Sequence, residues 1–416
     1  MQTTKEVIVT SNNSDESTNA AVWDPCTGSL LSSYRNGGPV GYHTLQILNG
    51  SYILAADSTK PKLYMWPLNS QTPVSNIRLT TPGKVSALSC TPNGLYIVAA
   101  ISEKLFIWQT NSGRLLTTLA RHYQTITCLK FTQDGSTFAT GGEDGLVFIW
   151  SLSKVINHKE QQSPSHSFAE HTLPVKDLHF GQFGPHSRLI SVSLDRTARI
   201  YNSVSGILLL TLIFDVPLTS VTTDLKETQL LVGCSNGTII KINLYDPPRG
   251  TDHYVDTEKN NSAIFRGHES NVVALSVSND CRTLLSGSTD GALHLWDIPS
   301  RQITKTIQHK GPITTAFFTK AFVNFRAQDL HQKILVKSLQ RISDDSSKDD
   351  FIEIVSSHND SHLLDYEAFI GNENHSMELN NDNFNDSLID ARVEMERLRK
   401  INASMYRYAA EYLLNK

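Results

Sequence analysis

The sequence predicts an all-β protein, a ring of seven similar units, and the spacing of its aromatic residues supports this. The five tryptophans each end an apolar stretch. Four of them lie 43, 42 and 42 residues apart, and 146 residues separate the fourth, Trp150, from the last, Trp296. Tyr201 and Asn243 follow apolar stretches at suitable places within that gap. A period near 42 residues with this ending is typical of the WD-repeat β-propeller, in which each repeat forms one blade.

The last complete repeat shows the expected order of strands within a blade. Residues 272–278, 283–288, 292–296 and 302–307 are four short, β-rich stretches. Four such strands per repeat make one propeller blade.

A histidine, an aspartate and an aromatic residue recur in a fixed frame in three repeats. The aspartate follows the histidine by 22 or 24 residues, and the aromatic residue follows the aspartate by 6. The three sets are His122, Asp144 and Trp150; His171, Asp195 and Tyr201; and His268, Asp290 and Trp296. We expect each set to join a nearby hydroxyl, such as that of Ser286 or Ser288, in a buried hydrogen-bonded chain that ties the strands of a blade together.

These sets also resemble the Ser-His-Asp triad of a hydrolase. A catalytic triad occurs once in a chain, with an exposed nucleophile and an oxyanion hole. Three copies in the same frame instead favour a structural device, so we predict no catalytic residues. A hydrolase or lyase built on a propeller would need polar groups that converge in the central channel, and sequence alone cannot place them.

Both chain ends are expected to close the ring. The N-terminal region holds three strand-like stretches, at 7–10, 20–23 and 30–34, and lacks a fourth. Residues 311–318 resemble an inner strand with no complete blade after it. Pairing the two regions would complete a seventh blade and remove exposed sheet edges. The segments 321–326 and 334–338 are also β-like, but their place is not assigned.

Two insertions, 153–165 and 245–261, lengthen the connections after third strands. Loops on a rigid scaffold often carry binding residues, but surface loops also tolerate insertion without any function. Both interpretations stay open.

Bulk properties limit the functions to be expected, although they do not exclude a local basic patch. The net charge of -4 gives no global reason to expect nucleic acid or membrane as a partner. The five cysteines are odd in number and form no CxxC pair, so we expect no metal site and no disulfide framework. The chain has no Walker motif, and we expect no cofactor. The polar N-terminus is unlike a signal peptide, and no apolar run approaches the roughly 20 residues of a membrane helix.

The composition changes after the propeller, which we expect to span residues 1–339. An acidic and Asn-rich linker, largely disordered, is expected at 340–386, followed by a helix at 387–416. Apolar residues alternate by 3 and 4 along this helix, in an a/d heptad pattern with Asn402 at an a position, which favours a two-stranded coiled coil. The stripe consists of Leu388, Ala391, Met395, Leu398, Asn402, Met405, Ala409 and Tyr412. We predict a homodimer through this helix; packing onto the propeller or into a partner's groove is the alternative.

Several phrases along the chain resemble the WD-repeat subunit of the rixosome, a complex that acts in assembly of the large ribosomal subunit. The truncated first blade and the terminal helix are the most specific of these features. The phrases are Pro92-Asn93-Gly94-Leu95-Tyr96, Arg121-His122-Tyr123-Gln124, Gly206-Ile207-Leu208-Leu209-Leu210 with Phe214-Asp215-Val216, Lys310-Gly311-Pro312-Ile313-Thr314 and Leu398-Arg399-Lys400-Ile401-Asn402. The resemblance runs from the N-terminus to the terminal helix, except in the linker at about 343–385.

The resemblance implies a non-enzymatic scaffold that dimerises and binds a large helical-repeat scaffold subunit through the propeller. It further implies contact with other rixosome subunits and with the pre-60S ribosomal particle, in processing of the internal spacer between rRNAs. Such a protein would reside in the nucleus, in nucleolus and nucleoplasm, and also in the cytoplasm. Direct contact with RNA and roles in DNA replication or heterochromatin stay open, and no membrane is involved.

A substrate receptor of a cullin-type ubiquitin ligase, or another WD-propeller adaptor, is the alternative. Such receptors often carry Trp-Asp-x-Arg at the ends of blades. Here Trp296-Asp297 is followed by Ile298-Pro299, and Trp23-Asp24 by Pro25-Cys26, so the arginine is missing at both places.

Overall fold

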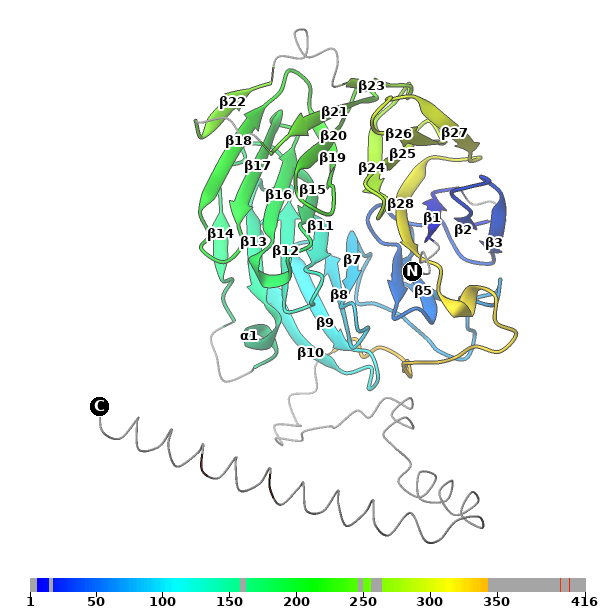
Figure 1. Ribbon diagram of the computed structural model, residues 1–416. Coiled ribbons are helices and arrows are strands. Elements are labelled where there is room, and N and C mark those ends of the chain that lie inside the picture. Colours follow the sequence, from blue (N-terminus) through cyan, green and yellow to red (C-terminus); the bar gives the residue numbers. More distant parts are fainter. Residues whose placement is uncertain are drawn as a thin grey trace. The chain divides into compact units, whose positions relative to one another are not determined.

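The computed structural model describes residues 6–14, 18–157, 162–245, 250–255 and 264–342, together with Arg397 and Ser404. The chain divides into two compact units, Met1–Val355 and Ser356–Lys416. In the second unit Arg397 and Ser404 are the residues described, and both are helical. The first unit is a seven-bladed WD-repeat β-propeller, as the aromatic spacing predicts (Figure 1).

We number the blades from the first sheet formed by consecutive strands. Blade 1 contains β4 (Gln46–Leu48), β5 (Tyr52–Ala56) and β6 (Leu63–Pro67). Blade 2 contains β7 (Ala87–Cys90), β8 (Tyr96–Ile101), β9 (Lys104–Gln109) and β10 (Leu115–Ala120). Blade 3 contains β11 (Ile126–Phe131), β12 (Thr137–Gly142), β13 (Val147–Ser151) and β14 (His166–Phe168).

The remaining blades complete the ring. Blade 4 contains β15 (Val175–Phe180), β16 (Arg188–Ser193), β17 (Thr197–Asn202), β18 (Leu208–Ile213) and β22 (Asp252–Tyr254). Blade 5 contains β19 (Leu218–Thr223), β20 (Gln229–Cys234), β21 (Thr238–Asn243) and β23 (Ile264–Arg266). Blade 6 contains β24 (Val272–Val277), β25 (Thr283–Ser288), β26 (Ala292–Asp297) and β27 (Ile303–Gln308). Blade 7 contains β28 (Ile313–Lys320), β1 (Glu6–Asn12), β2 (Ala20–Trp23) and β3 (Leu30–Tyr34).

Blade 7 joins both ends of the propeller sequence, which confirms the predicted closure. Strand β28 pairs antiparallel with β1 from Glu6 opposite Lys320 to Asn12 opposite Ile313. Because β1 lies between β28 and β2, its backbone groups pair on both sides. The inner strand of the seventh blade therefore comes from one end of the propeller sequence and its three outer strands from the other.

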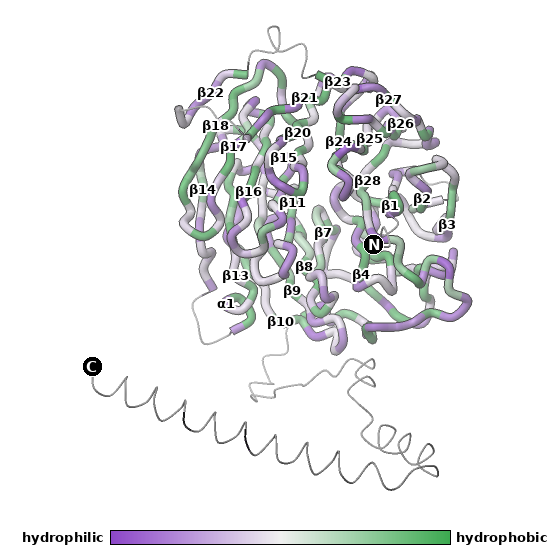
Figure 2. Tube along the Cα trace, in the orientation of Figure 1, coloured by the Kyte–Doolittle hydropathy of each residue, from purple (hydrophilic) through white to green (hydrophobic). Residues whose placement is uncertain are grey.

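Apolar side chains from neighbouring blades fill the space between the sheets. Trp66, Trp108, Trp150 and Trp296 are among the largest fully buried side chains. Apolar residues recur along the strands of the blades in Figure 2. This pattern fits sheets that are covered on both faces by the next blade.

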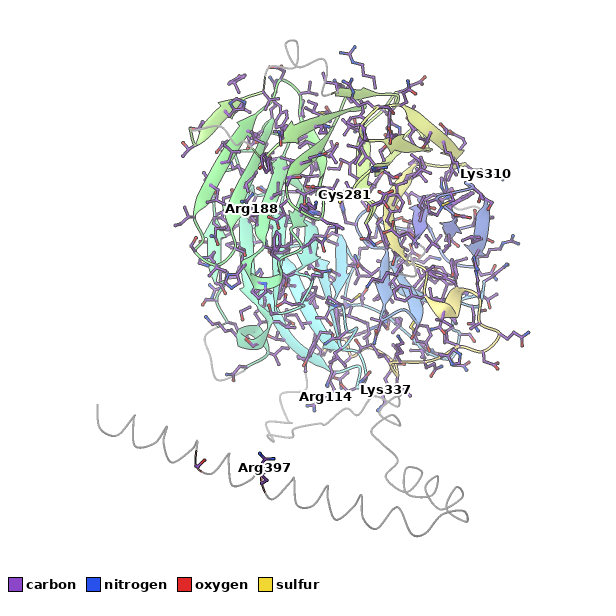
Figure 3. The ribbon with its side chains drawn as sticks, viewed as in Figure 1. Arg114, Arg188, Cys281, Lys310, Lys337 and Arg397 are labelled. Carbon is purple, nitrogen blue, oxygen red and sulfur yellow. The ribbon has the colours of Figure 1, made fainter. Side chains whose placement is uncertain are left out.

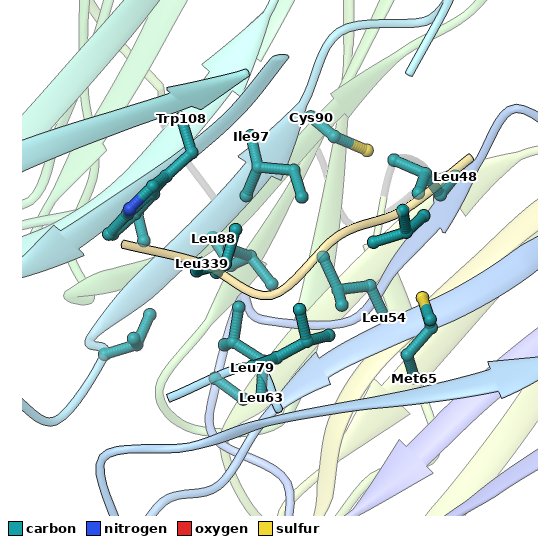
Figure 4. Close-up of a cluster of buried hydrophobic side chains, with 14 of the residues drawn as sticks. Leu48, Leu54, Leu63, Met65, Leu79, Leu88, Cys90, Ile97, Trp108 and Leu339 are labelled. Carbon is teal, nitrogen blue, oxygen red and sulfur yellow. The ribbon is translucent and has the colours of Figure 1, made fainter. Parts of the chain in front are cut away.

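Blade 1 has three regular strands in the described part of the chain, not the four expected of every repeat. The place beside β6 is taken by an irregular segment, in which Val74 donates its N–H to the Met65 carbonyl and Thr80 bridges to Lys62. Its outer side is covered by residues 330–342, which we call the C-terminal strap. Ile334, Val336 and Leu339 of the strap are buried among side chains of blades 1 and 2, and Figure 4 shows Leu339 beside Leu88 and Leu79.

Hydrogen bonds fix the strap to blade 2 at several points. The Trp108 indole donates to the Gln340 carbonyl at 2.7 Å, and the Gln340 N–H donates to Gly113 at 2.9 Å. The Leu115 N–H donates to the side chain of Gln340 at 3.2 Å. These partners are loop and side-chain groups rather than a regular ladder. The strap is therefore extended without being a strand.

The β-like segments 321–326 and 334–338 are not strands. The first contains a 3-10 turn, η3 (Val323–Phe325), and the second belongs to the strap. The buried and exposed residues of the strap alternate because it lies in a groove between two blades. That alternation gives the segment the same sequence pattern as a half-buried strand.

The two insertions differ in structure. The first contains a short helix, α1 (Leu152–Ile156), and the second contributes β22, which pairs in parallel with β18 of blade 4. Residues 158–161, 246–249 and 256–263 of these insertions lie outside the described part of the chain. The second insertion thus adds a fifth strand to a blade that precedes it in the chain.

Candidate functional site: the blade networks and the central channel

The three predicted sets each come together inside a blade. In blade 6, His268 lies with Nδ1 3.3 Å from Asp290 and Nε2 2.7 Å from the Ser286 hydroxyl. The Trp296 indole N–H donates to the same hydroxyl at 2.8 Å. The hydrogen-bonded chain therefore runs from Asp290 through His268 and Ser286 to Trp296, and it joins two loops to two strands.

Blade 3 has the same arrangement with a threonine at its centre. His122 Nδ1 lies 3.0 Å from Asp144 and Nε2 3.0 Å from the Thr140 hydroxyl. The Trp150 indole donates to that hydroxyl at 3.1 Å. The Asp144 carboxylate also accepts the Tyr123 N–H at 3.0 Å, so it orders the loop that carries the histidine.

Blade 4 differs at its aromatic end. His171 Nδ1 lies 2.8 Å from Asp195 and Nε2 2.7 Å from the Ser191 hydroxyl. The Tyr201 hydroxyl donates to Glu170 at 3.1 Å. A phenol hydroxyl extends further from the backbone than an indole N–H, so Tyr201 can contact the Glu170 carboxylate. The hydrogen-bonded chains of blades 3 and 6 contain no such glutamate.

In blades 3 and 6, burial favours the neutral form of the histidine. Burial lowers the pKa of His268 to about 4, and His294 acts in the same direction while Asp290 opposes it. Burial likewise lowers the pKa of His122, against the effect of Asp144. Burial alone would raise the pKa of Asp195, but hydrogen bonds from His171 and Thr197 outweigh it, and the net shift is downward.

The hydroxyls of these sets are unsuited to nucleophilic attack. Thr140, Ser191 and Ser286 are fully buried. In blades 3 and 6 the hydroxyl already accepts an indole N–H and contacts the histidine. A triad nucleophile has to reach a substrate carbonyl beside an oxyanion hole. The geometry therefore fits strand fixation better than catalysis.

A Gly-x-Ser-x-Gly sequence also occurs in blade 5, where Ser235 lies between Gly233 and Gly237. In hydrolases this sequence forms a strained turn from a strand into a helix. Here it forms the tight turn between β20 and β21, and Gly237 has a φ of 83°. The turn is therefore a β-hairpin and offers no nucleophile elbow.

A related set, not found from the sequence, lies in blade 7. The Trp23 indole donates to the Thr10 hydroxyl at 2.9 Å, and the ring of His309 lies 5.5 Å from that of Trp23. His309 precedes its inner strand by four residues, as His268 does. Ser14 stands where blades 3, 4 and 6 have aspartate, four residues after the hydroxyl. The common spacing before the inner strand was the sequence signal for this set.

The assignment of Asn243 to the aromatic position of blade 5 is wrong. Leu230 pairs with Ile242, as Leu284 pairs with Trp296 in blade 6, so Ile242 holds that position. The register places Val232 where blade 6 has Ser286, and Phe214 precedes its inner strand by four residues. An apolar cluster thus replaces the polar chain in this blade. The 42-residue spacing misled because Ile242 follows Tyr201 by 41 residues, one fewer than the period.

The central channel holds a second group of polar residues. Asp177, on β15, is buried and accepts the N–H groups of Leu178 at 2.9 Å and Val221 at 3.1 Å. His43 lies 4.0 Å from it, and burial lowers the pKa of His43 despite this carboxylate. Cavities of about 370 and 430 Å³ lie along the channel, with Lys130 lining the first and His179 the second. Positive and negative groups are mixed here, and no single ligand chemistry is favoured.

The chain is similar to several known proteins. A family model described as "WD domain, G-beta repeat" matches residues 113–151, 162–202 and 259–297, the three repeats that hold the predicted sets. "WD repeat-containing protein 18" of Danio rerio is 37% identical over 347 residues, which cover 83% of this chain and 80% of the relative. The chain belongs to the WD repeat-containing protein 18 family. The resemblance that the sequence indicated is therefore confirmed.

Other relatives include a further member of this family and two pre-rRNA-processing proteins. The Homo sapiens member is 38% identical, with 79% of this chain and 76% of the relative covered. "Pre-rRNA-processing protein IPI3" of Yarrowia lipolytica is 32% identical, with 65% of this chain and 67% of the relative covered. "Pre-rRNA-processing protein pro-1" of Caenorhabditis elegans is 26% identical, with 75% and 61% covered.

The described part of this family member offers no site for a metal ion formed by three or more His, Cys, Asp or Glu side chains. No helix in the same part is long and apolar enough to cross a membrane. The heptad residues Leu388, Ala391, Met395, Leu398, Asn402, Met405, Ala409 and Tyr412 lie outside the described residues.

Acidification is expected to destabilise the propeller. Burial lowers the pKa of His179, His268 and His309 to about 4 in the folded state, against about 6.5 in the unfolded chain. Between these values the unfolded chain binds more protons, so stability falls as the pH falls. We expect the free energy of unfolding to fall by on the order of 1–2 kcal/mol per histidine between pH 7.5 and pH 5. Urea unfolding at the two values tests this, and equal midpoints would contradict it.

Proposed function

We propose that this chain is a non-enzymatic scaffold subunit of the rixosome, which supports maturation of the pre-60S ribosomal particle and processing of the rRNA internal spacer. The observation that supports it most is the similarity to pre-rRNA-processing proteins over about two thirds of the chain or more. The polar side chains of the three sets form hydrogen bonds within their blades. Binding to other proteins would therefore use the propeller surface. We place the protein in the nucleus, in nucleolus and nucleoplasm.

Within this proposal the propeller, residues 1–339, binds the helical-repeat scaffold subunit. The linker at 340–386 tethers a terminal helix at 387–416, through which two copies of the chain pair. Heptad stripes with charged flanks favour such pairing, and an Asn at an a position favours two strands in register.

Purification of the tagged chain tests the proposed function. We expect pre-60S assembly factors and spacer-containing pre-rRNA to co-elute, as measured by mass spectrometry and probing of the RNA. Recovery of cullin-ligase adaptors without assembly factors would overturn the proposal.

The dimer has its own test. A variant with Met395→Lys and Leu398→Lys places two charges in the apolar stripe, and we expect its mass by light scattering to fall to that of one chain. A matched control, Glu396→Lys with Ala403→Lys, adds two lysines outside the stripe and should leave the mass unchanged. A stripe variant that keeps the mass of two chains would exclude pairing through this helix.

A further inference from the structure

Positive charge is concentrated in one part of this acidic chain. The chain has a net charge of -4, yet residues 58–133 contain eight Lys and Arg and one acidic residue, Glu103. The strap, 330–342, contains three more cations and no acidic residue. These segments form blades 1 and 2, the first strand of blade 3 and the cover over blades 1 and 2.

The fold gathers several of these cations around Thr80. Lys62 bridges to Thr80, and the Arg341 guanidinium donates to the Thr80 hydroxyl at 3.2 Å. The Thr81 N–H donates to the Pro61 carbonyl at 3.1 Å, which brings the turn that contains Lys60 to the same place. Arg78 precedes Thr80 by two residues, and its N–H donates to the Ser338 hydroxyl of the strap at 3.3 Å.

The basic surface continues along the strap onto blade 2. Lys337 donates its N–H to the Thr110 carbonyl, and Gly113 lies against the backbone of Lys337 and Ser338. Arg114 follows directly, and Figure 3 shows Arg114 and Lys337 close together. The Thr81 hydroxyl donates to the Gly83 carbonyl at 2.7 Å, and Lys84 follows this turn directly. We call the whole set the basic seam; it consists of Lys60, Lys62, Arg78, Lys84, Arg114, Lys337 and Arg341.

The exposed charges of the seam are available to a ligand. Lys60, Arg78, Lys84 and Lys337 are exposed, and none forms an ion pair within the described residues. The neighbouring carboxylate of Asp57 is buried and accepts N–H groups of Thr59 and Lys60. Like charges held together by a rigid fold repel one another, and a polyanion relieves that repulsion.

We propose that the basic seam binds the phosphate backbone of RNA without reading its bases. Lys and Arg on a rigid surface supply the contacts that phosphates require. The seam has no exposed aromatic ring on which a base could stack. The proposal deepens the proposed function and rests on it for the choice of RNA as the polyanion.

The test uses the full chain and a fluorescent 20-nucleotide oligouridylate, measured by anisotropy from 50 to 200 mM salt. The seam variant carries Arg78→Gln, Lys84→Gln and Lys337→Gln. The control carries Lys154→Gln, Lys226→Gln and Lys320→Gln, which removes equal charge from exposed positions outside the seam. We expect the seam variant to bind at least tenfold more weakly, with a salt slope lower by about 2, since each lost phosphate contact removes about 0.7 for a single strand.

Equal weakening in both variants would show diffuse attraction and would overturn the proposal. Failure of the natural chain to bind the oligouridylate would also overturn the proposal. This holds even if a variant with Asp344, Asp345, Asp349 and Asp350 changed to Asn does bind it, because the ligand of the seam would then be the acidic segment of the chain itself. Binding of polyglutamate in place of RNA would indicate an acidic protein partner. Purification of the seam variant separates the two proposals: assembly factors still co-elute if only RNA contact fails.

Discussion

Replacement of Val336 by aspartate is expected to destabilise the propeller strongly. Val336 lies buried in the cluster that joins the strap to blades 1 and 2. The change removes about 1.5–3 kcal/mol of apolar burial and adds a carboxylate that has no partner in an apolar site. We expect the free energy of unfolding to fall by at least about 3 kcal/mol. At the largest losses, we expect the strap to detach from the blades. Urea unfolding and limited proteolysis measure both outcomes.

The strap contains its own control for this experiment. Leu335 precedes Val336 and is 51% exposed. Leu335→Asp introduces the same charge one residue away, and we expect a change within about 0.5 kcal/mol, as for other surface substitutions. Equal effects of the two variants would mean that the strap is not held in this register.

Replacement of Ser286 by valine alone is expected to cost more free energy of unfolding than joint replacement of His268, Ser286 and Trp296 in blade 6. The single change leaves the Trp296 N–H and one nitrogen of His268 without their partner. Each unsatisfied buried group costs about 1–3 kcal/mol. The sum suggests a loss of roughly 2–6 kcal/mol in the free energy of unfolding.

Blade 5 shows how the polar chain can be replaced as a unit. It has Phe214, Val232 and Ile242 at the places of His268, Ser286 and Trp296. A triple variant, His268→Phe with Ser286→Val and Trp296→Ile, leaves no indole or imidazole to satisfy. We expect it to lose less stability than Ser286→Val alone. It should also lose less of that stability on acidification, because the histidine with a lowered pKa is gone. A triple variant less stable than the single one would show that packing outweighs hydrogen bonding in this blade.

The periodic part of the fold could be predicted from the sequence, and the irregular part could not. Blades repeat at a nearly fixed period, so Trp150 and Trp296 each indicate the third strand of a blade. The strand missing before residues 7–10 implied a pairing partner at 311–318. The strap has no period, and its contacts with Trp108 and Thr80 join residues more than 200 positions apart. Such contacts leave no local trace in the sequence.

The candidate sets show a similar division. Spacing brought His268, Asp290 and Trp296 together because the aspartate precedes the aromatic residue by 6 residues in every set and the histidine precedes the aspartate by 22 or 24. The blade 7 set was missed because the turn between its strands is longer and Ser14 replaces the aspartate. In blade 5 a polar residue next to the correct position, Asn243 beside Ile242, was preferred on spacing alone. Strand register distinguishes them, and register is a property of the folded sheet.

The pairing of Ile8 with Phe318 has a consequence for biosynthesis. Strand β1 leaves the ribosome early, but its inner partner is made about 300 residues later. At roughly 5–20 residues per second, one edge of β1 waits about 15–60 seconds before the ring can close. During that interval an apolar strand with free N–H and carbonyl groups is exposed to other nascent chains. The ring, and with it the pairing of this strand edge, can therefore close only after translation reaches β28.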